Sequence, residues 1–190
     1  MKILIVCEGE HEQSGALKNL LVRLGGDHAD YVHEDVSKIR AFHGKGSRLF
    51  KKAITCLRLA VSDSYDALVF LIDQDGQSER IPQIRQAQDY LELSLKRAMG
   101  VAIKTFDAWM LSDEQALTKV LGYTVPTQPD PEQIDNPNQK CQELLKARET
   151  EMAQREMYAK VAKHIDIEIL STRCPKGFKP FADNVKKIFP

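Results

Sequence analysis

The sequence of 190 residues lacks the features that would assign it to a membrane or to a disulfide-rich class of protein. Its longest apolar runs, ILIVC near the start and ALVFLI at residues 67–72, are far shorter than the roughly 20 residues that a membrane-spanning helix needs. The four cysteines lie far apart without a CxxC pair, which indicates neither a disulfide framework nor a cysteine-based zinc site. We therefore expect a cytoplasmic protein with reduced thiols and no membrane partner.

The sequence also lacks an excess of charge of either sign. Lys plus Arg and Asp plus Glu number 27 each, which excludes a strongly basic protein that coats nucleic acid over its whole surface. Any polyanion must be held locally, and the candidates are HGKGSRLFKK at residues 43–52 and CPKGFKP at residues 174–180. A solvated basic surface is the simpler explanation for such short clusters.

Two common glycine-rich phosphate loops are missing as well. No GxGxxG follows the first apolar run, and no GxxxxGK[ST] occurs in the chain, so neither type of nucleotide-binding loop is supported. DQDG at residues 73–76 differs from the calcium loop of an EF-hand, because its glycine is fourth where that pattern needs it sixth.

Two strands are the clearest elements that the sequence does contain. KILIVC at residues 2–7 and DALVFLI at residues 66–72 are continuous apolar runs without polar alternation. Such runs are typical of strands that are buried on both faces of a parallel sheet. We expect a weaker second strand within residues 29–37 and a fourth strand at residues 101–105.

Helical patterns separate these strands. The first ends at Gly25-Gly26, the second follows Ser47 as its N-cap, the third spans about residues 81–99, and the fourth runs over residues 106–122. This alternation predicts an α/β fold with an open, mostly parallel sheet of about four strands and helices on both faces.

The composition changes after this α/β region. Residues 1–122 are expected to form the α/β domain, and residues 123–137 contain four prolines without apolar periodicity, which predicts a linker or loop. Helical patterns return over residues 138–190, which we interpret as a helical C-terminal appendage. Its role as a dimer arm or as a lid stays open, so a homodimer or a larger complex is compatible with the sequence.

Acidic side chains follow the ends of the predicted strands. Ligands of open parallel sheets bind at the carboxyl ends of the strands, where this chain has Glu8, Asp73, Asp75 and the Lys104–Asp107 region. Carboxylates that converge repel one another unless a cation lies between them, and hard oxygen ligands suit Mg²⁺ or Mn²⁺. A plain turn at Asp75-Gly76 is the alternative explanation of the second aspartate.

The segments ILIVCEGEHE and VFLIDQDG together resemble the TOPRIM domain of topoisomerases, bacterial primases and OLD-family nucleases. That domain has a glutamate in an EG turn after its first strand and a DxD pair after its third. The resemblance covers about residues 1–113. With AIKTFDAWMLSD and CPKGFKPFA, the chain also resembles bacterial TOPRIM-like families of unassigned function.

The resemblance implies roles by position. Glu8 matches the glutamate that acts as a general acid or base near the metal, and Asp73 and Asp75 match the metal-binding aspartates; all three are expected to bind the metal. Asp107 matches a carboxylate before an Ala-Trp pair, where OLD-like nucleases often have glutamate. For Asp107 the alternative explanation is structural, because the helix dipole favours an acid in the first turn of a helix. The same alternative applies to Glu12, which lies one helical turn after Glu8.

These residues indicate metal-assisted phosphoryl transfer. A divalent ion would polarise a phosphodiester, while Lys45 or Lys104 neutralises its other oxygens. His11 and His43 are further candidates for proton transfer or are plain polar surface residues. No tyrosine lies in a recognisable setting for a nucleophile, so water is the more economical one.

We therefore expect a Mg²⁺-dependent TOPRIM-type phosphodiesterase. The expected activity is that of a nuclease acting on nucleic acid, on DNA in preference to RNA, with a role in genome maintenance or phage defence. The alternative is a non-catalytic component of a larger complex that uses the acidic edge to bind a metal or nucleic acid.

Overall fold

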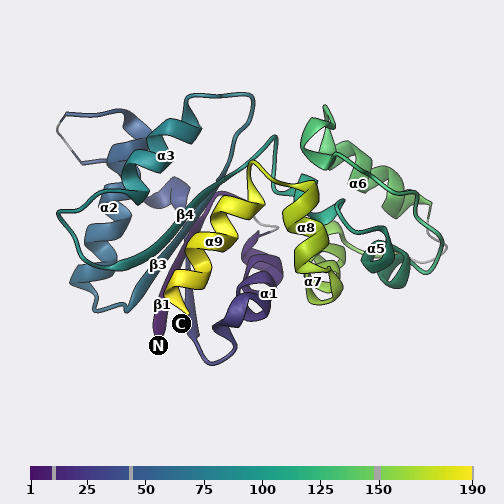
Figure 1. The fold of residues 1–190 in the computed structure, drawn as a ribbon, viewed down its shortest axis with the longest axis horizontal. Helices are drawn as coiled ribbons and strands as arrows, with labels where there is room; N and C mark the ends of the chain where they lie inside the picture. Colours follow the sequence, from purple (N-terminus) through teal and green to yellow (C-terminus); the bar gives the residue numbers. More distant parts are fainter. Residues whose placement is uncertain (10–11, 43–44, 148–150, 190) are drawn as a thin grey trace.

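The computed structural model describes residues 1–9, 12–42, 45–147 and 151–189. Its centre is a parallel sheet with the strand order β2-β1-β3-β4 (Figure 1). The strands are β1 (Lys2–Cys7), β2 (Asp30–Asp35), β3 (Ala67–Asp73) and β4 (Lys96–Ala102). All three strand pairs are parallel, which confirms the α/β fold and the open parallel sheet predicted from the sequence.

Helices cover both faces of this sheet (Figure 1). The longer helices are α2 (Arg48–Ser62), α3 (Arg80–Gln88), α5 (Glu114–Leu121), α6 (Pro137–Lys146), α7 (Gln154–His164) and α9 (Phe178–Ile188). The shorter ones are η1 (Glu12–Ala16), α1 (Leu17–Leu21), η2 (Val22–Gly26), η3 (Val36–Lys38), α4 (Asp107–Met110), η4 (Pro131–Gln133) and α8 (Ile167–Arg173). No helix in the described part of the chain is long and apolar enough to cross a membrane.

The central strands β1 and β3 are buried on both faces. Successive side chains of a strand point to opposite faces, so Leu4 and Val6 join the hydrophobic cluster with α2 and α3, whereas Ile3 and Ile5 join the cluster on the other face. Two apolar layers explain why these strands read as unbroken hydrophobic runs.

The start of α2 forms as the sequence predicts. Ser47 is the N-cap, and its hydroxyl accepts a hydrogen bond from Phe50 N at 3.3 Å. At the other end of the α/β region, Gly122 ends α5 with a left-handed backbone, φ 81°, which glycine adopts without steric cost.

The predicted helix over residues 81–99 and the predicted strand at residues 101–105 are wrong in their bounds. Helix α3 already ends at Gln88, and β4 begins at Lys96. β4 is an edge strand that opens with Lys and Arg, so its first half does not read as apolar. The Gln88 side chain bonds this open edge: its Nε2 donates to Arg97 O at 3.2 Å, and its Oε1 accepts from Met99 N at 2.8 Å.

The predicted helix over residues 106–122 is divided into α4 and α5. Asp113 interrupts it as the N-cap of α5, because Oδ1 accepts hydrogen bonds from Gln115 N at 2.9 Å and Ala116 N at 3.1 Å. Its other oxygen, Oδ2, accepts from Asp166 N at 2.8 Å. Asp113 therefore accepts hydrogen bonds from backbone groups of two separate segments.

The helices after residue 138 share one hydrophobic cluster with the sheet. Trp109 is fully buried there, and its ring centroid lies 5.1 Å from that of Phe178 and 5.6 Å from that of Phe181. Helix α9 lies along β4 (Figure 1). Aromatic residues from residues 138–190 thus complete the layer that covers one face of the sheet.

Candidate functional site

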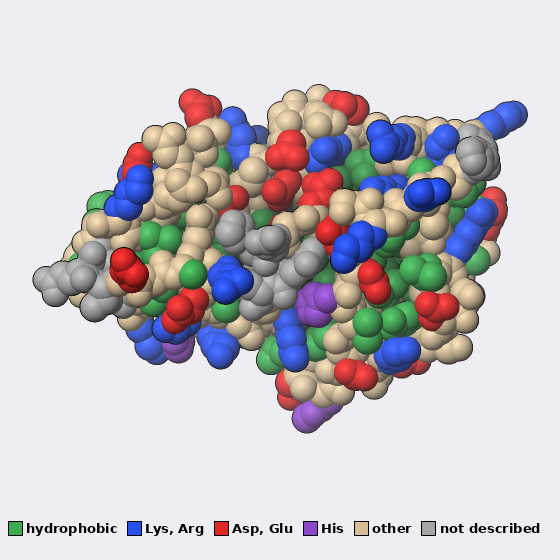
Figure 2. Space-filling view, turned by 180° about the vertical axis from the view of Figure 1, so that it is seen from behind, with side chains coloured by type: hydrophobic (Ala, Val, Ile, Leu, Met, Phe, Trp, Pro, Cys, Tyr) green, Lys and Arg blue, Asp and Glu red, His purple; other side chains and the backbone are tan. Residues whose placement is uncertain are grey.

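The end of β1 meets the end of β3 at one edge of the sheet. Glu8 directly follows β1, Asp73 is the last residue of β3, and Glu8 Oε2 accepts a hydrogen bond from Asp73 N at 3.2 Å. Asp75 lies two residues further along, in the turn that leaves β3. The structure therefore brings together Glu8, Asp73 and Asp75. Figure 2 shows Asp and Glu side chains gathered near the middle of one face of the molecule.

Arg80 lies between two of these carboxylates. Its Nη1 donates to Glu8 Oε2 and to Asp75 Oδ2, both at 3.2 Å, and to Asp73 O at 2.6 Å. Its side chain is 16% exposed. Sequence reasoning missed this residue, although a basic residue in the first turn of a helix is disfavoured by the helix dipole. A basic residue at this position, five residues after Asp75, was therefore a signal for a carboxylate partner.

The pKa of the Asp73 carboxyl group lies well above its usual range. Its pKa is raised from 3.8 to about 8, mainly by burial and also by the charges of Glu12, Asp75 and Asp107, while a hydrogen bond from Phe106 N opposes this rise. That bond reaches Asp73 Oδ1 at 2.7 Å. The backbone between β4 and α4 thus orients the Asp73 carboxyl group toward the same cluster.

Glu12 extends the cluster into the protein. Its side chain is buried, and burial together with the charges of Asp107 and Glu8 raises its pKa from 4.5 to about 7. Gly9 lies against it so closely that an added Cβ would be 2.1 Å from Glu12 Oε2. The glycine of the EG turn therefore has a steric reason: only a residue without a side chain leaves room for the Glu12 carboxyl group.

Asp107 is held by the C-terminal half of the chain. Its Oδ1 accepts from Asn138 Nδ2 at 3.0 Å, from Gln154 Nε2 at 3.2 Å and from the Tyr158 hydroxyl. These donors come from α6 and α7, and no sequence pattern indicated them. Asp107 is buried at the first position of α4, so it is both the first-turn acid considered from the sequence and a neighbour of the cluster.

The two lysine candidates, Lys104 and Lys45, differ from the acids in their position relative to the cluster. The Lys104 backbone adjoins the turn, because its carbonyl accepts from Asp75 N at 3.0 Å, but its ammonium group pairs with Asp135 at 3.4 Å. Lys45 is exposed. His11 and His43 lie outside the described residues.

The turn at Asp75-Gly76 also has a local explanation. Both residues have positive φ angles, 49° and 71°, a region that aspartate and glycine tolerate better than most residues. Turn geometry therefore accounts for the presence of Asp75, and its bond to Arg80 accounts for where the carboxylate points.

The acids could hold a divalent cation only after a local rearrangement. Hard carboxylate oxygens are the donors that Mg²⁺ and Mn²⁺ prefer, and Glu8, Asp73 and Asp75 supply them. Within the described residues, however, no group of three His, Cys, Asp or Glu side chains is arranged to hold a metal. The Arg80 guanidinium stands between Glu8 and Asp75, so a metal shared by these two requires Arg80 to turn away.

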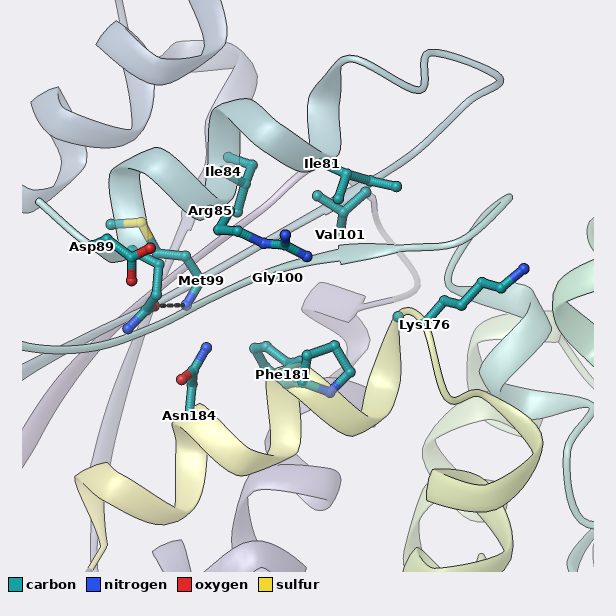
Figure 3. A pocket seen from close by; sticks show the side chains of 13 residues that line it. Ile81, Ile84, Arg85, Asp89, Met99, Gly100, Val101, Lys176, Phe181 and Asn184 are labelled. Carbon is teal, nitrogen blue, oxygen red and sulfur yellow. Dashed lines mark hydrogen bonds between the residues drawn. The ribbon is translucent and has the colours of Figure 1, made fainter.

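A separate pocket of about 280 Å³ lies at the open edge of the sheet (Figure 3). It is enclosed by α3, β4 and α9, with apolar side chains such as Ile84 and Phe181 inside and Arg85 and Lys176 among the lining residues. None of the acidic cluster residues lines it. This pocket is therefore distinct from the candidate site.

A family model described as a domain of unknown function, DUF4276, matches residues 7–186. No curated protein and no solved structure matches the sequence.

Proposed function

This chain belongs to the DUF4276 family, and we propose that it is a Mg²⁺-dependent phosphodiesterase of the TOPRIM type that hydrolyses nucleic acid, DNA in preference to RNA. One observation carries the proposal: Glu8 and the DxD pair come from the ends of two adjacent strands and lie around a single guanidinium group. This is the edge of a parallel sheet at which ligands bind.

The electrostatics of the cluster favour an additional cation. Glu8, Glu12, Asp73, Asp75 and Asp107 lie near one another, and their mutual repulsion helps to raise the pKa values of Glu12 and Asp73. Arg80 pairs with only two of the five carboxyl groups. Bound cations are often the largest local charges of such sites and stabilise carboxylates in the charged form.

The residues of the site have separable roles in this proposal. Mg²⁺ or Mn²⁺ held by Glu8, Asp73 and Asp75 would supply Lewis-acid activation of a phosphodiester. Asp73 is oriented for this by Phe106 N. Arg80, once it has turned away from Glu8 and Asp75 to admit the metal, would neutralise negative charge beside the reacting phosphate, and water is the nucleophile. Asp107 holds α4 to α6 and α7 and so positions the wall of the site.

A second candidate function is a non-catalytic TOPRIM-like component that binds nucleic acid or metal within a larger complex. The observation that favours it is the Arg80 contact itself. Arg80 already neutralises Glu8 and Asp75, so the acidic edge holds together without a metal. In this case the edge would be a binding surface without hydrolysis.

Cleavage assays separate the two candidates. The purified chain is incubated with labelled single-stranded and duplex DNA and RNA, with Mg²⁺, with Mn²⁺ or with EDTA. The test variant is Asp73→Asn, which keeps an oxygen to accept from Phe106 N. The matched control is Asp63→Asn, because Asp63 is exposed at the end of α2.

The hydrolase predicts metal-dependent cleavage that is lost in Asp73→Asn and kept in Asp63→Asn. Absence of cleavage of every substrate with both metals contradicts it and favours the binding component. Cleavage that survives equally in Asp73→Asn would place the activity outside the acidic cluster.

A further inference from the structure

A second cavity, of about 400 Å³, opens directly beside Glu8. It lies between the first turns of α2 and of α3. Its lining residues are Glu8, Arg48, Leu49, Lys52, Gln77, Glu79, Arg80 and Gln83. The cavity shares Glu8 and Arg80 with the acidic cluster, so whatever binds in it adjoins the proposed catalytic site.

Two of its cations are available for a ligand. Arg48 and Lys52 are four residues apart on α2, a spacing that places both side chains on the same face of a helix. Neither forms an ion pair with any described residue, whereas Arg80 is paired. Glu79 is the one acid of the lining besides Glu8, so Arg48 and Lys52 leave the cavity with a surplus of positive charge.

Arg80 is the third cation of the cavity, and hydrogen bonds from a single nitrogen atom fix the orientation of its guanidinium group. All three of its hydrogen bonds to described residues use the same atom, Nη1. The Nε and Nη2 atoms make none with the described part of the chain. A guanidinium group that is anchored through one nitrogen presents its remaining N–H groups in a fixed plane, the geometry that suits two oxygens of a phosphate.

We propose that this cavity binds a phosphate of a nucleic-acid backbone through Arg48, Lys52 and Arg80. The identity of the ligand rests on the proposed function; the anion site itself does not. The net charge of the whole chain is zero, so a polyanion is held by local surplus charge. Since phosphates repeat along a strand, one phosphate in the cavity presents a neighbouring phosphodiester to Glu8, Asp73 and Asp75.

The test measures binding apart from cleavage. Fluorescence anisotropy follows a labelled single-stranded DNA and its duplex in EDTA, over a range of salt concentrations, with the wild type, Arg48→Ala, Lys52→Ala and the double variant. Lys186→Ala, which removes one exposed charge from α9, is the matched control. Inorganic phosphate and a mononucleotide serve as competitors, and circular dichroism melting checks that each variant is folded.

We expect each single variant to weaken binding by about 3- to 10-fold at low salt and to lower the slope of log K against log salt by about 0.7 for each lost phosphate contact. Lys186→Ala should bind like the wild type. If the mononucleotide competes as strongly as unlabelled DNA, the ligand of the cavity is a small phosphate compound and not a nucleic-acid backbone. That result would overturn the nucleic-acid assignment.

The outcomes separate this inference from the proposed function. If Arg48→Ala and Lys52→Ala bind DNA as well as Lys186→Ala does, the inference is overturned even when the wild type cleaves DNA. If both variants lose binding but the wild type cleaves nothing with Mg²⁺ or Mn²⁺, the phosphate site stands and the hydrolase does not. No binding by the folded wild type overturns the inference.

Discussion

The Nη1 atom of Arg80 lies 2.6 Å from the backbone oxygen of Asp73, and this contact joins the first turn of α3 to the end of β3. The same atom bonds Glu8 and Asp75. Arg80 therefore acts as the internal counter-ion of the acidic edge, in the position that a shared metal would need.

Replacing Arg80 should make the acidic edge depend on metal. In Arg80→Ala, Glu8 and Asp75 lose their counter-ion, so we expect the melting temperature in EDTA to fall by about 2–4 °C, which corresponds to about 1 kcal/mol for a chain of this size. Adding Mg²⁺ should raise the melting temperature of this variant by more than it raises that of the wild type.

Arg85→Ala is the matched control for this experiment. Arg85 lies five residues further along α3 and is exposed, so its loss should change neither the melting temperature nor the response to Mg²⁺. An equal Mg²⁺ response in the wild type and in Arg80→Ala would show that Arg80 does not compete with a cation.

The hydroxyl of Tyr158 should contribute to stability through Asp107. Tyr158 is fully buried, and Tyr158→Phe removes one of three donors to Asp107 Oδ1. We expect the free energy of unfolding, measured by urea denaturation, to fall by about 1–3 kcal/mol, because a buried carboxylate loses a hydrogen bond.

Tyr123→Phe tests whether this loss is specific. The Tyr123 hydroxyl donates to a neutral backbone oxygen, Leu144 O, at 2.6 Å and is only partly buried, so its removal should cost less. A larger loss in Tyr123→Phe than in Tyr158→Phe would contradict the importance assigned to the Asp107 network.

Gly100 of β4 should not tolerate a side chain. A Cβ at this position would lie 2.7 Å from Cδ2 of Phe181, so Gly100→Ala forces α9 away from the sheet. Overpacking of this kind typically costs about 1–3 kcal/mol. The smaller side chain of Phe181→Leu should recover part of that loss in the double variant. If the two changes add without recovery, the clash is not with Phe181.

The ion pair between Glu114 and Arg173 should make stability depend on pH in acid. The hydrogen bond from Arg173 lowers the pKa of Glu114 from 4.5 to about 2. A lowered carboxyl pKa stabilises the fold above the unfolded value and ceases to do so below the folded value. The contribution is thus present above pH 4.5 and is lost as the pH falls toward about 2.

Glu114→Gln removes this dependence. The stability difference between the wild type and Glu114→Gln, measured by urea denaturation, should shrink steadily from pH 5 to the lowest pH at which both remain folded. Glu143→Gln, at an exposed pair with Lys140, should show a smaller change. A difference that stays constant over this range would contradict the assignment.

The sequence indicated the strands and the acidic edge better than the helices around them. The apolar runs that form β1 and β3 can be recognised as strands in the sequence, because both faces of each strand are buried. The single long helix predicted over residues 106–122 failed, because Asp113 caps a new helix while also bonding Asp166 N, a residue far away in the chain.

The sequence alone determined that Glu8 and the DxD pair lie at the ends of two buried parallel strands. Alternating strands and helices give parallel strands, and the carboxyl ends of parallel strands lie at the same edge of the sheet. Only the tertiary structure decided that Arg80 stands between Glu8 and Asp75, that Gly9 gives space to Glu12, and that donors from α6 and α7 hold Asp107. The physical reason is that these contacts join residues from separate elements, and their geometry depends on how the elements pack together.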